Sequence, residues 1–380
     1  MHLAVSSRQL AGLVTLLLCL ATAPTHAEKF TIAVISDTQN YTDVARAQPR
    51  GIDVFMGQMR YLVDSRTEKN LVFVTHVGDV VQHGDGRFRT GPKDQPTDWN
   101  TRAEWMLANR AISILSEAGL PFGLSPGNHD YDNYAWPAEV GPSRPLTGGK
   151  AWNAWFGPNS SHFAGKRWYG GASPDGLSSY QQFSAGGKRF LHLSLEMEAS
   201  PAVLDWAQGV INRHRGQPTI VTTHEWLDPN FTGATTRSND NKAYFEGAAN
   251  LPPDQVWERF IRRNDQIFLV LAGHDWTPTN EGRSNGENLR IDQNDAGHPV
   301  YQTVQDYQGN TIGPDGTPGS DNGGAGWMRF IEFDTRAKTM HFYTYSSLLG
   351  KHAGRNGEAT FGATPQHSDF VLDFPPQLMR

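Results

Sequence analysis

The sequence predicts an α/β fold in which two mixed β-sheets pack as a sandwich with flanking helices. Three observations support this prediction: short apolar runs rich in β-branched residues, amphipathic segments between the first of these runs, and two hairpin patterns later in the chain. Apolar runs without alternation are typical of strands buried on both faces. Strands that alternate with helices indicate parallel pairing through right-handed crossovers, and the hairpins add antiparallel strands.

The first half of the chain alternates strands with helices. Residues 30–37 (FTIAVISD) form a first apolar run, and the segment 51–69 spaces its apolar residues as a helix does. A second apolar run follows at 71–79, and an amphipathic helix at 99–119 ends at a glycine. Residues 121–130 then predict a third strand that runs into a loop.

The second half begins with a hairpin at 177–197, whose two alternating strands flank a Gly-Gly pair. The other expected elements are a helix at 201–214, a strand at 218–226, a helix at 253–263, a strand at 266–276 and a hairpin at 326–347. Segments 131–179 and 277–325 are rich in Gly and polar or aromatic residues, so we expect long loops over the site there.

Aromatic and basic residues are frequent in the segment 131–179. Such residues suit a phosphorylated ligand with a flat moiety, such as a nucleotide. The tryptophans of AWNAWFG (151–157), however, have the spacing of a short packed helix. We therefore expect most of these aromatic side chains to bury the segment against the sheets, which leaves the substrate open.

Residues 1–27 have the features of a secretory signal peptide: a basic residue, Arg8, then an apolar core, then a small residue, Ala27, at the expected cleavage site. The core is shorter than the roughly 20 residues that span a bilayer. We expect residues 28–380 to form a single secreted or periplasmic domain without a membrane span. Cys19, the only cysteine, lies in the signal peptide, which excludes disulfides and thiolate ligands from the mature chain.

The charge of the chain argues against two classes of partner. The formal net charge is −6, and no block of like charges interrupts the sequence. Nucleic-acid and anionic-membrane surfaces need clusters of basic residues, so neither is expected. The sequence gives no indication of the oligomeric state.

Polar residues follow five of the predicted strands. They are Asp37, Asp79, Asn128, His224 and His274. Taken singly, each has an ordinary explanation as a turn, a helix N-cap or a buried histidine. Open α/β sheets bind ligands at the carboxyl ends of their strands. Carboxylates, an amide and imidazoles that meet at one point indicate a metal site.

The motifs DTQ, GD, GNHD, H and GHDW occur in this order over residues 31–276. This series resembles the calcineurin-like metallophosphoesterase superfamily, whose pattern is D-x-H, GD, GNH[DE], H and GHxH. The resemblance implies a four-layer α/β sandwich and two divalent metals that share a carboxylate. It also implies hydrolysis of a small phosphorylated substrate by metal-bound hydroxide.

The resemblance assigns metal ligands residue by residue. In chain order they are Asp37, Gln39, Asp79, Asn128, His224 and His274. Asp79 is expected to bridge the two metals. One metal would be held by Asp79 together with Asn128 and the two histidines, and the other by Asp37, Gln39 and Asp79.

Two positions depart from the family pattern, which has histidine at both. Gln39 retains a carbonyl oxygen that can coordinate a hard cation, but the indole nitrogen of Trp276 has no lone pair to offer. We expect one firm and one exchangeable metal among Mn, Mg, Zn, Fe and Ca, and fewer nitrogen ligands favour Mn, Mg or Ca over Zn at the poorer site. Asp275 or an acid from 277–325 is a candidate for the missing ligand.

Catalytic roles are also implied by the resemblance. His129 is expected to protonate the leaving group, with Asp130 orienting its ring. His76 and His83 are expected to serve packing or loop structure. The leading hypothesis is a phosphoesterase that acts on a monoester, a diester or a nucleotide pyrophosphate. The alternatives are a non-catalytic metal-containing binding protein on the same scaffold and a hydrolase of a non-phosphate ester in which the metal has only a stabilising role.

Overall fold

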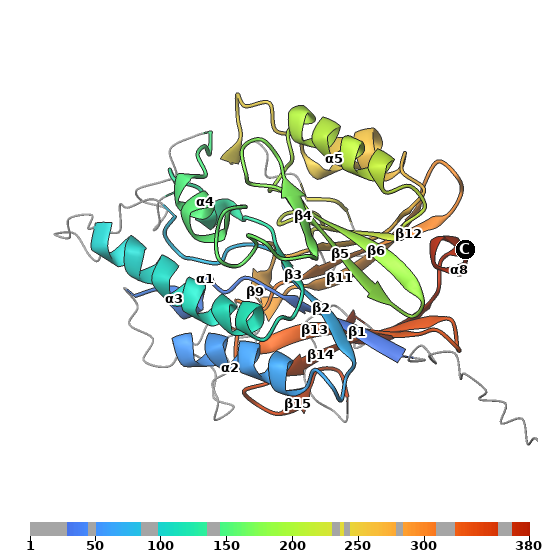
Figure 1. Ribbon diagram of the computed structural model, residues 1–380, viewed down its shortest axis with the longest axis horizontal. Coiled ribbons are helices and arrows are strands. Elements are labelled where there is room, and N and C mark those ends of the chain that lie inside the picture. The colour runs from blue at the N-terminus through green and yellow to red at the C-terminus, as the bar shows by residue number, and fades with distance from the viewer. Residues whose placement is uncertain are drawn as a thin grey trace, which may run out of the picture.

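Two seven-stranded mixed sheets form the centre of the described part of the protein (Figure 1). This computed structural model describes residues 29–44, 51–84, 98–134, 145–229, 236–238, 244–278, 284–308, 324–355 and 367–380. The expected signal peptide lies outside these residues. Within them, no helix combines the length and apolar character that a membrane span requires. The predicted two-sheet α/β fold class is confirmed.

The first sheet combines parallel and antiparallel pairing. Its strands are, in spatial order, β15 (Lys351–His352), β14 (Thr339–Ser346), β13 (Trp327–Asp334), β1 (Lys29–Ile35), β2 (Leu71–His76) and β3 (Phe122–Leu124), with β16 (Asp369–Asp373) also paired to β14. Strands β1, β2 and β3 run parallel, and β13 joins β1 in the antiparallel sense. The predicted strand–helix alternation and the C-terminal hairpin of β13 and β14 therefore share this sheet.

The second sheet is also mixed. In spatial order its strands are β11 (Glu287–Gln293), β12 (Pro299–Gln305), β8 (Ile267–Ala272), β7 (Thr219–Thr222), β6 (Lys188–Ser194), β5 (Ser179–Ala185) and β4 (Tyr169–Ala172). Strands β6, β7, β8 and β12 run parallel. A separate small ribbon pairs β9 (Thr277–Pro278) with β10 (Ser284–Asn285).

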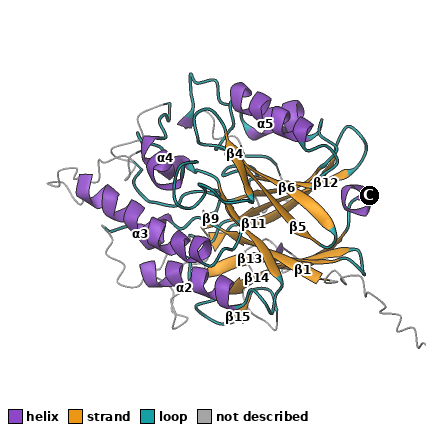
Figure 2. Cartoon of the chain, viewed as in Figure 1, coloured by secondary structure: helices purple, strands orange, loops and turns teal. Residues whose placement is uncertain are grey.

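Helices cover the outer faces of both sheets, as Figure 2 shows. The described helices are α1 (Gln39–Thr42), α2 (Gly51–Asp64), α3 (Asp98–Glu117), η1 (Asn128–Asp130), α4 (Lys150–Phe156), α5 (Pro201–Arg213), α7 (Pro253–Val256), η2 (Trp257–Ile261) and α8 (Pro376–Met379). Helices α2 and α3 pack on the first sheet, and α5 packs with η2 on the second. Four layers result.

The apolar runs of the sequence are explained by burial on both faces. In β1, Ala33 and Ile35 pack toward α2 and α3, whereas Ile32 and Val34 pack into the layer between the sheets. All four side chains are fully buried. Each buried Ile or Val side chain contributes about 1.5–3 kcal/mol relative to exposure, so the central strands are strongly fixed in register.

One predicted loop is wrong in part. The segment 277–325 contains β11 and β12, which form an antiparallel hairpin at the edge of the second sheet. Polar residues interrupt the apolar pattern of these two strands. They are tolerated in the interior because they are hydrogen-bonded: the buried Gln302 accepts at Oε1 from Trp226 Nε1 at 3.0 Å. Residues 279–283 and 309–323 lie outside the described residues.

The segment 131–179 is mostly irregular, but it contains α4 and β4. Trp152 of α4 is buried in the core beside α3, and Trp155 and Trp168 pack against that core. The expectation that these aromatic side chains bury the segment is confirmed for the described residues. They therefore support the segment 131–179 against the first sheet.

Candidate metal centre

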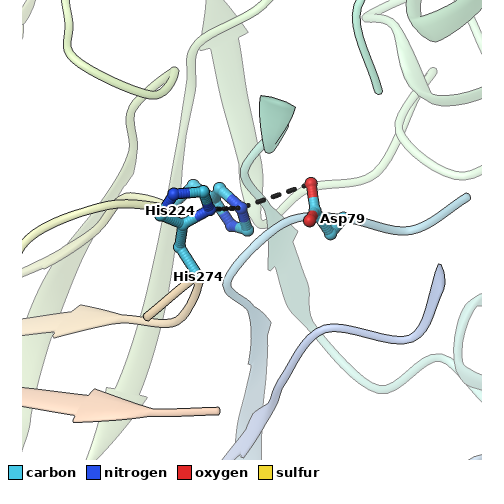
Figure 3. Close-up of side chains that lie close together, drawn as sticks. All are labelled: Asp79, His224 and His274. Atoms are coloured by element: carbon cyan, nitrogen blue, oxygen red, sulfur yellow. Dashed lines mark hydrogen bonds and ion pairs between the residues drawn. The ribbon is translucent and has the colours of Figure 1, made fainter. Parts of the chain in front are cut away.

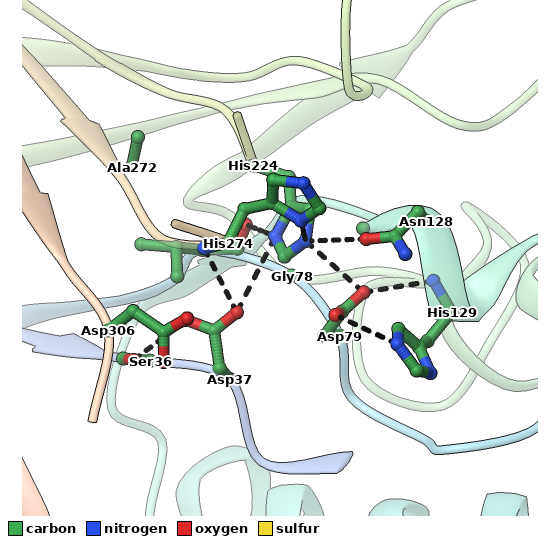
Figure 4. A network of polar contacts seen from close by, with 12 residues as sticks. Ser36, Asp37, Gly78, Asp79, Asn128, His129, His224, Ala272, His274 and Asp306 are labelled. Atoms are coloured by element: carbon green, nitrogen blue, oxygen red, sulfur yellow. Dashed lines mark hydrogen bonds and ion pairs between the residues drawn. The ribbon is translucent and has the colours of Figure 1, made fainter. Parts of the chain in front are cut away.

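Five predicted site residues lie beyond the carboxyl ends of parallel strands. Asp37 and Asp79 follow β1 and β2 in the first sheet, and Asn128 begins η1 after β3. His224 and His274 follow β7 and β8 in the second sheet. Figure 4 shows that these side chains face a common point between the two sheets. The predicted convergence of distant segments is therefore present.

The backbone is held in unusual conformations at this point. Asp37, Asp79 and His274 have positive φ angles of 27°, 55° and 71°. A residue other than glycine in such a conformation costs on the order of 1–3 kcal/mol. Such conformations persist where the surrounding structure fixes them, and they cluster at functional sites.

Two motif glycines allow the close approach of site carboxylates. A Cβ on Gly127 would lie 2.2 Å from Asp79 Oδ1, and a Cβ on Gly273 would lie 2.3 Å from Asp37 Oδ2. Both distances are far shorter than any real carbon–oxygen contact. The glycines of GNHD and GHDW are therefore required by the packing of the site itself.

A nitrogen-rich half of the centre consists of Asp79, Asn128, His224 and His274. The Nε2 atom of His224 lies 3.2 Å from Asp79 Oδ1, 3.1 Å from Asn128 Oδ1 and 3.1 Å from His274 Nδ1. One ligand atom from each of Asp79, His224 and His274 lies within 4.8 Å of the others (Figure 3). The Nδ1 atom of His224 is 3.0 Å from the Val77 carbonyl, so it donates there and leaves Nε2 with a free lone pair for a metal.

An oxygen-rich half consists of Asp37, Gln39 and Asp79. Asp37 accepts hydrogen bonds from Ser36 Oγ at 2.7 Å and from the His274 backbone N–H at 3.1 Å. Gln39 Nε2 donates to Asp79 Oδ2 at 3.0 Å. The buried Oε1 atom of Gln39 has no hydrogen-bond partner among the described residues. An unsatisfied buried acceptor is costly, and a cation would satisfy it.

The electrostatics of the two halves differ. Burial raises the pKa of Asp37 well above its usual value, and the negative charges of Asp306 and Asp79 raise it further. Burial also acts to raise the pKa of Asp79, but His224 and His129 outweigh burial and leave its pKa below the usual value. The histidines thus lower the pKa of the shared carboxylate Asp79, whereas burial and like charges raise the pKa of Asp37.

His129 lies beside the shared carboxylate. Its Nε2 atom is 3.8 Å from Asp79 Oδ2 and 2.9 Å from the Tyr134 hydroxyl. Its Nδ1 atom is 2.8 Å from the Gln82 carbonyl, which makes Nδ1 the donor. Burial lowers the pKa of His129 to about 4. Its backbone N–H also donates to Asp79 Oδ1 at 2.9 Å, so this residue helps to fix Asp79.

The expected role of Asp130 is wrong. Its carboxylate accepts hydrogen bonds from the backbone N–H groups of Gly127, Val80 and Val81, at 2.9 to 3.1 Å. The ring of His129 is oriented instead by the Gln82 carbonyl. In the short helix η1, consecutive side chains point in different directions, so Asp130 turns away from the centre and ties the two motif loops together.

A second buried group lies behind His129. Asp43, His83 and Glu104 each offer a ligand atom, and these atoms lie within 4.8 Å of one another. Glu104 accepts from the backbone N–H groups of Gln82 and His83 at 3.1 and 2.9 Å, and it pairs with His83 Nδ1 at 2.9 Å. Glu104 thus anchors the turn whose carbonyl orients His129, which agrees with a structural role for His83.

A comparison with protein families agrees with this geometry. The family model described as calcineurin-like phosphoesterase matches residues 30–278. The chain belongs to the calcineurin-like phosphoesterase family. Family membership indicates a metal-dependent phosphoester hydrolase in general terms, and it confirms the predicted resemblance.

Two individual proteins are similar to this member of the family. The uncharacterized protein YvnB of Bacillus subtilis (strain 168) is 25% identical over 360 residues, which cover 94% of this chain and 23% of that protein. The chain therefore spans less than a quarter of the relative's length. A solved structure described as GAP50, the anchor in the inner membrane complex of Plasmodium, is 12% identical with a TM-score of 0.39, and the match covers 85% of this chain and 86% of that one.

The residues present fit the divalent metals of a calcineurin-like phosphoesterase. The unpartnered Oε1 of Gln39 faces no donor of the described residues, and the Nε2 atom of His224 lies within 3.2 Å of two oxygen atoms that can ligate a metal, Asn128 Oδ1 and Asp79 Oδ1. Trp276 stands where the family has histidine, and 40% of its side chain is exposed. It is therefore not a core tryptophan.

Asp306 is the functional candidate that the motifs do not reveal. It follows β12 directly, is fully buried, and raises the pKa of Asp37 through its charge. No family motif marks it. The signal in the sequence is its place at the end of the run PVYQTVQ (299–305), which alternates weakly and lies in the segment for which a loop is predicted.

Proposed function

We propose that this chain hydrolyses a small phosphate ester, a monoester, diester or nucleotide pyrophosphate, with two divalent metals. The main support for the proposal is the position of the Asp79 carboxylate. One of its oxygens, Oδ1, lies 3.2 Å from His224 Nε2, and the other, Oδ2, lies 3.0 Å from Gln39 Nε2. Each oxygen thus faces a different half of the centre, which is the arrangement that a carboxylate shared by two metals needs.

The protein residues have distinct tasks in this proposal. Bound metals would supply the Lewis acidity that lowers the pKa of a water molecule and offsets phosphate charge. Val77 and Ser36 hold His224 and Asp37 in their ligating orientations. Asp79 keeps the two halves in fixed relation, because His129 and Gln39 donate to its two oxygens.

His129 is the proposed proton donor to the leaving oxygen. Its Nδ1 donates to the Gln82 carbonyl, so Nε2, the atom that faces Asp79, carries a proton only in the imidazolium form, and His129 must take up a proton before it can donate one. The Tyr134 hydroxyl is hydrogen-bonded to the same nitrogen and would exchange this proton with it. Asp130 has no direct part in the transfer.

Metal reconstitution tests the proposed function. The protein is freed of metal by chelation, and hydrolysis of p-nitrophenyl phosphate and of its bis-ester is measured after addition of Mn, Mg, Zn, Fe or Ca. We expect at least one metal to restore hydrolysis, and the ratio of the two rates to separate monoesterase from diesterase action. Tight metal binding without hydrolysis of either ester would instead support the non-catalytic binding protein.

We also propose export of the mature chain from the cell. The apolar core and small residues of positions 1–27 support cleavage after Ala27. N-terminal sequencing of the protein recovered from a secreting host tests this, with Glu28 expected as the first residue. An intact N-terminus in the cytoplasmic fraction would contradict it.

A further inference from the structure

We propose that Asp306 is the fourth protein ligand of the oxygen-rich half and replaces the imidazole that Trp276 lacks. The inference rests on the proposed two-metal function and deepens it, because it assigns a residue that the family pattern does not contain. The ion that this assignment predicts for the oxygen-rich half is a hard divalent cation such as Mn²⁺ or Mg²⁺.

The sheet topology brings Asp306 to the metal centre. Strand β12 runs parallel to β8, and Val304 is paired with Ala272. Asp306 and His274 lie two residues beyond that pair, so both leave their strands at the same level. Asp306 thus occupies a strand end of the same kind as the other site residues, in the same sheet as His224 and His274.

The carboxyl groups of Asp306 and Asp37 form a buried pair. Their exposed fractions are 0% and 1%, and Figure 4 shows the two groups next to each other. Burial raises the pKa of both groups, and the charge of Asp306 further raises the pKa of Asp37. Two buried carboxylates are costly unless a cation lies between them. A divalent metal would remove this cost.

The hydrogen bonds around this pair leave acceptors free for a cation. Gln308 donates from its backbone N and from its Nε2 to the two oxygens of Asp306, each at 2.9 Å. Gln308 Oε1 accepts from Gln39 Nε2 at 2.5 Å. Gln39 therefore uses its amide nitrogen for Gln308 and Asp79, and only its unpartnered Oε1 remains. Ligating carboxylates are commonly fixed by such outer donors.

The resulting donor set determines the expected ion. Carboxylates from Asp37, Asp79 and Asp306 and the amide oxygen of Gln39 are all hard oxygen donors. Such sets select Mn²⁺, Mg²⁺ or Ca²⁺, whereas imidazole suits Zn²⁺ and Fe²⁺. The alternative is that Asp306 and Asp37 share one proton in place of a metal, and the experiment separates the two.

The test counts metals in the full chain. Metal-free wild type, Asp306→Asn and Asp306→Ser are titrated with Mn²⁺ by calorimetry, and thermal unfolding is followed with and without Mn²⁺. Asp295→Asn is the matched control, because Asp295 lies in the turn between β11 and β12, and pairs with Arg262 away from the centre.

We expect two Mn²⁺ ions in wild type and in the control. Each Asp306 variant should keep one ion and bind the second at least ~10-fold more weakly. Without metal, Asp306→Asn should unfold at the wild-type temperature or above, because a buried like charge is gone. A purely structural Asp306 would give the reverse: lower metal-free stability and an unchanged ion count.

Two results would overturn the assignment. The first is two equally tight ions in Asp306→Asn and Asp306→Ser, and the second is a single ion in wild type, as a shared proton predicts. None of these measurements uses substrate. A protein that loses one ion with Asp306 but hydrolyses no ester would retain the assignment and refute the proposed function.

Discussion

The nitrogen-rich and oxygen-rich halves share Asp79 but differ in the donors around it. His224 and His274 give the first half two imidazoles from the second sheet, and the second half has only oxygen donors in Asp37 and Gln39. Imidazole sites bind first-row metals such as Zn²⁺ firmly, whereas oxygen sites suit exchangeable Mn²⁺ or Mg²⁺. One shared carboxylate can thus join two sites of unequal affinity and selectivity.

Replacement of the shared carboxylate should have the largest effect. Asp79→Asn retains the shape of the side chain but removes charge from both halves. We expect both ions to bind more than about 100-fold more weakly, since even the loss of an outer hydrogen-bond partner costs 10–100-fold in metal affinity. Hydrolysis should fall below detection. Calorimetry with Mn²⁺ and Zn²⁺ measures the binding.

The exposed Asp295→Asn variant is the control for Asp79→Asn and should match wild type in both measurements. Loss of only one ion in Asp79→Asn would show that Asp79 belongs to a single half. The nitrogen-rich and oxygen-rich halves would then not share a ligand.

Removal of the proposed acid should reduce turnover without altering either half. For His129→Ala we expect kcat for an alkyl phosphate to fall by about 100-fold or more, because general acid catalysis contributes 10²–10⁴-fold. The effect on p-nitrophenyl phosphate should be much smaller, since p-nitrophenolate departs without a proton. Steady-state kinetics on both esters, with metal counts, check this.

Equal losses of kcat on the two esters would contradict proton donation by His129. The matched comparison is Asp130→Asn, which removes an acceptor of three backbone N–H groups. That variant should lose about 1–3 kcal/mol of unfolding free energy. If Asp130 has the structural role, His129→Ala should lose less unfolding free energy than Asp130→Asn.

One substitution in each half tests whether the two halves prefer different metals. His224→Ala removes an imidazole, and Asp37→Asn removes a carboxylate. Each should bind one ion, and we expect Zn²⁺ to be retained by Asp37→Asn but not by His224→Ala. Metal analysis after dialysis against equal Zn²⁺ and Mn²⁺ measures the difference. The same metal content in both variants would mean that the halves are not chemically distinct.

The smallest effect is expected at Trp276. With Asp306 as the fourth oxygen ligand, Trp276→His should leave the number of bound ions at two and change Mn²⁺ affinity little, because the side chain at this position is partly exposed. Calorimetry checks this as well. A markedly tighter second ion would show that position 276 still reaches the centre.

The parts of the fold that the sequence predicts are those buried on two faces. All side chains of β8 and those of residues 32–35 in β1 are apolar on both faces, so these runs can be recognised in the sequence without a partner strand. Site residues at the ends of such runs, such as Asp37 and His274, are predictable for the same reason. Convergence then follows from parallel topology.

Strands with polar side chains in the interior, and the directions of single side chains, are harder to predict. In β12, Gln302 and Gln305 are buried and hydrogen-bonded, so the run lacks the apolar continuity of a central strand. The end of β12 is therefore not visible in the sequence, and the sequence alone does not assign Asp306 to the metal centre. Asp130 follows His129 directly, but sequence adjacency does not fix direction, and its carboxylate meets backbone donors on the far side of the loop.

Anomalous diffraction from crystals of the Mn²⁺-loaded protein shows directly whether two ions lie on either side of the Asp79 carboxylate. We predict two anomalous peaks about 3.5–4 Å apart, one nearest His224 and His274 and the other nearest Asp37 and Gln39. A single peak, or two peaks that do not share Asp79, would contradict this prediction.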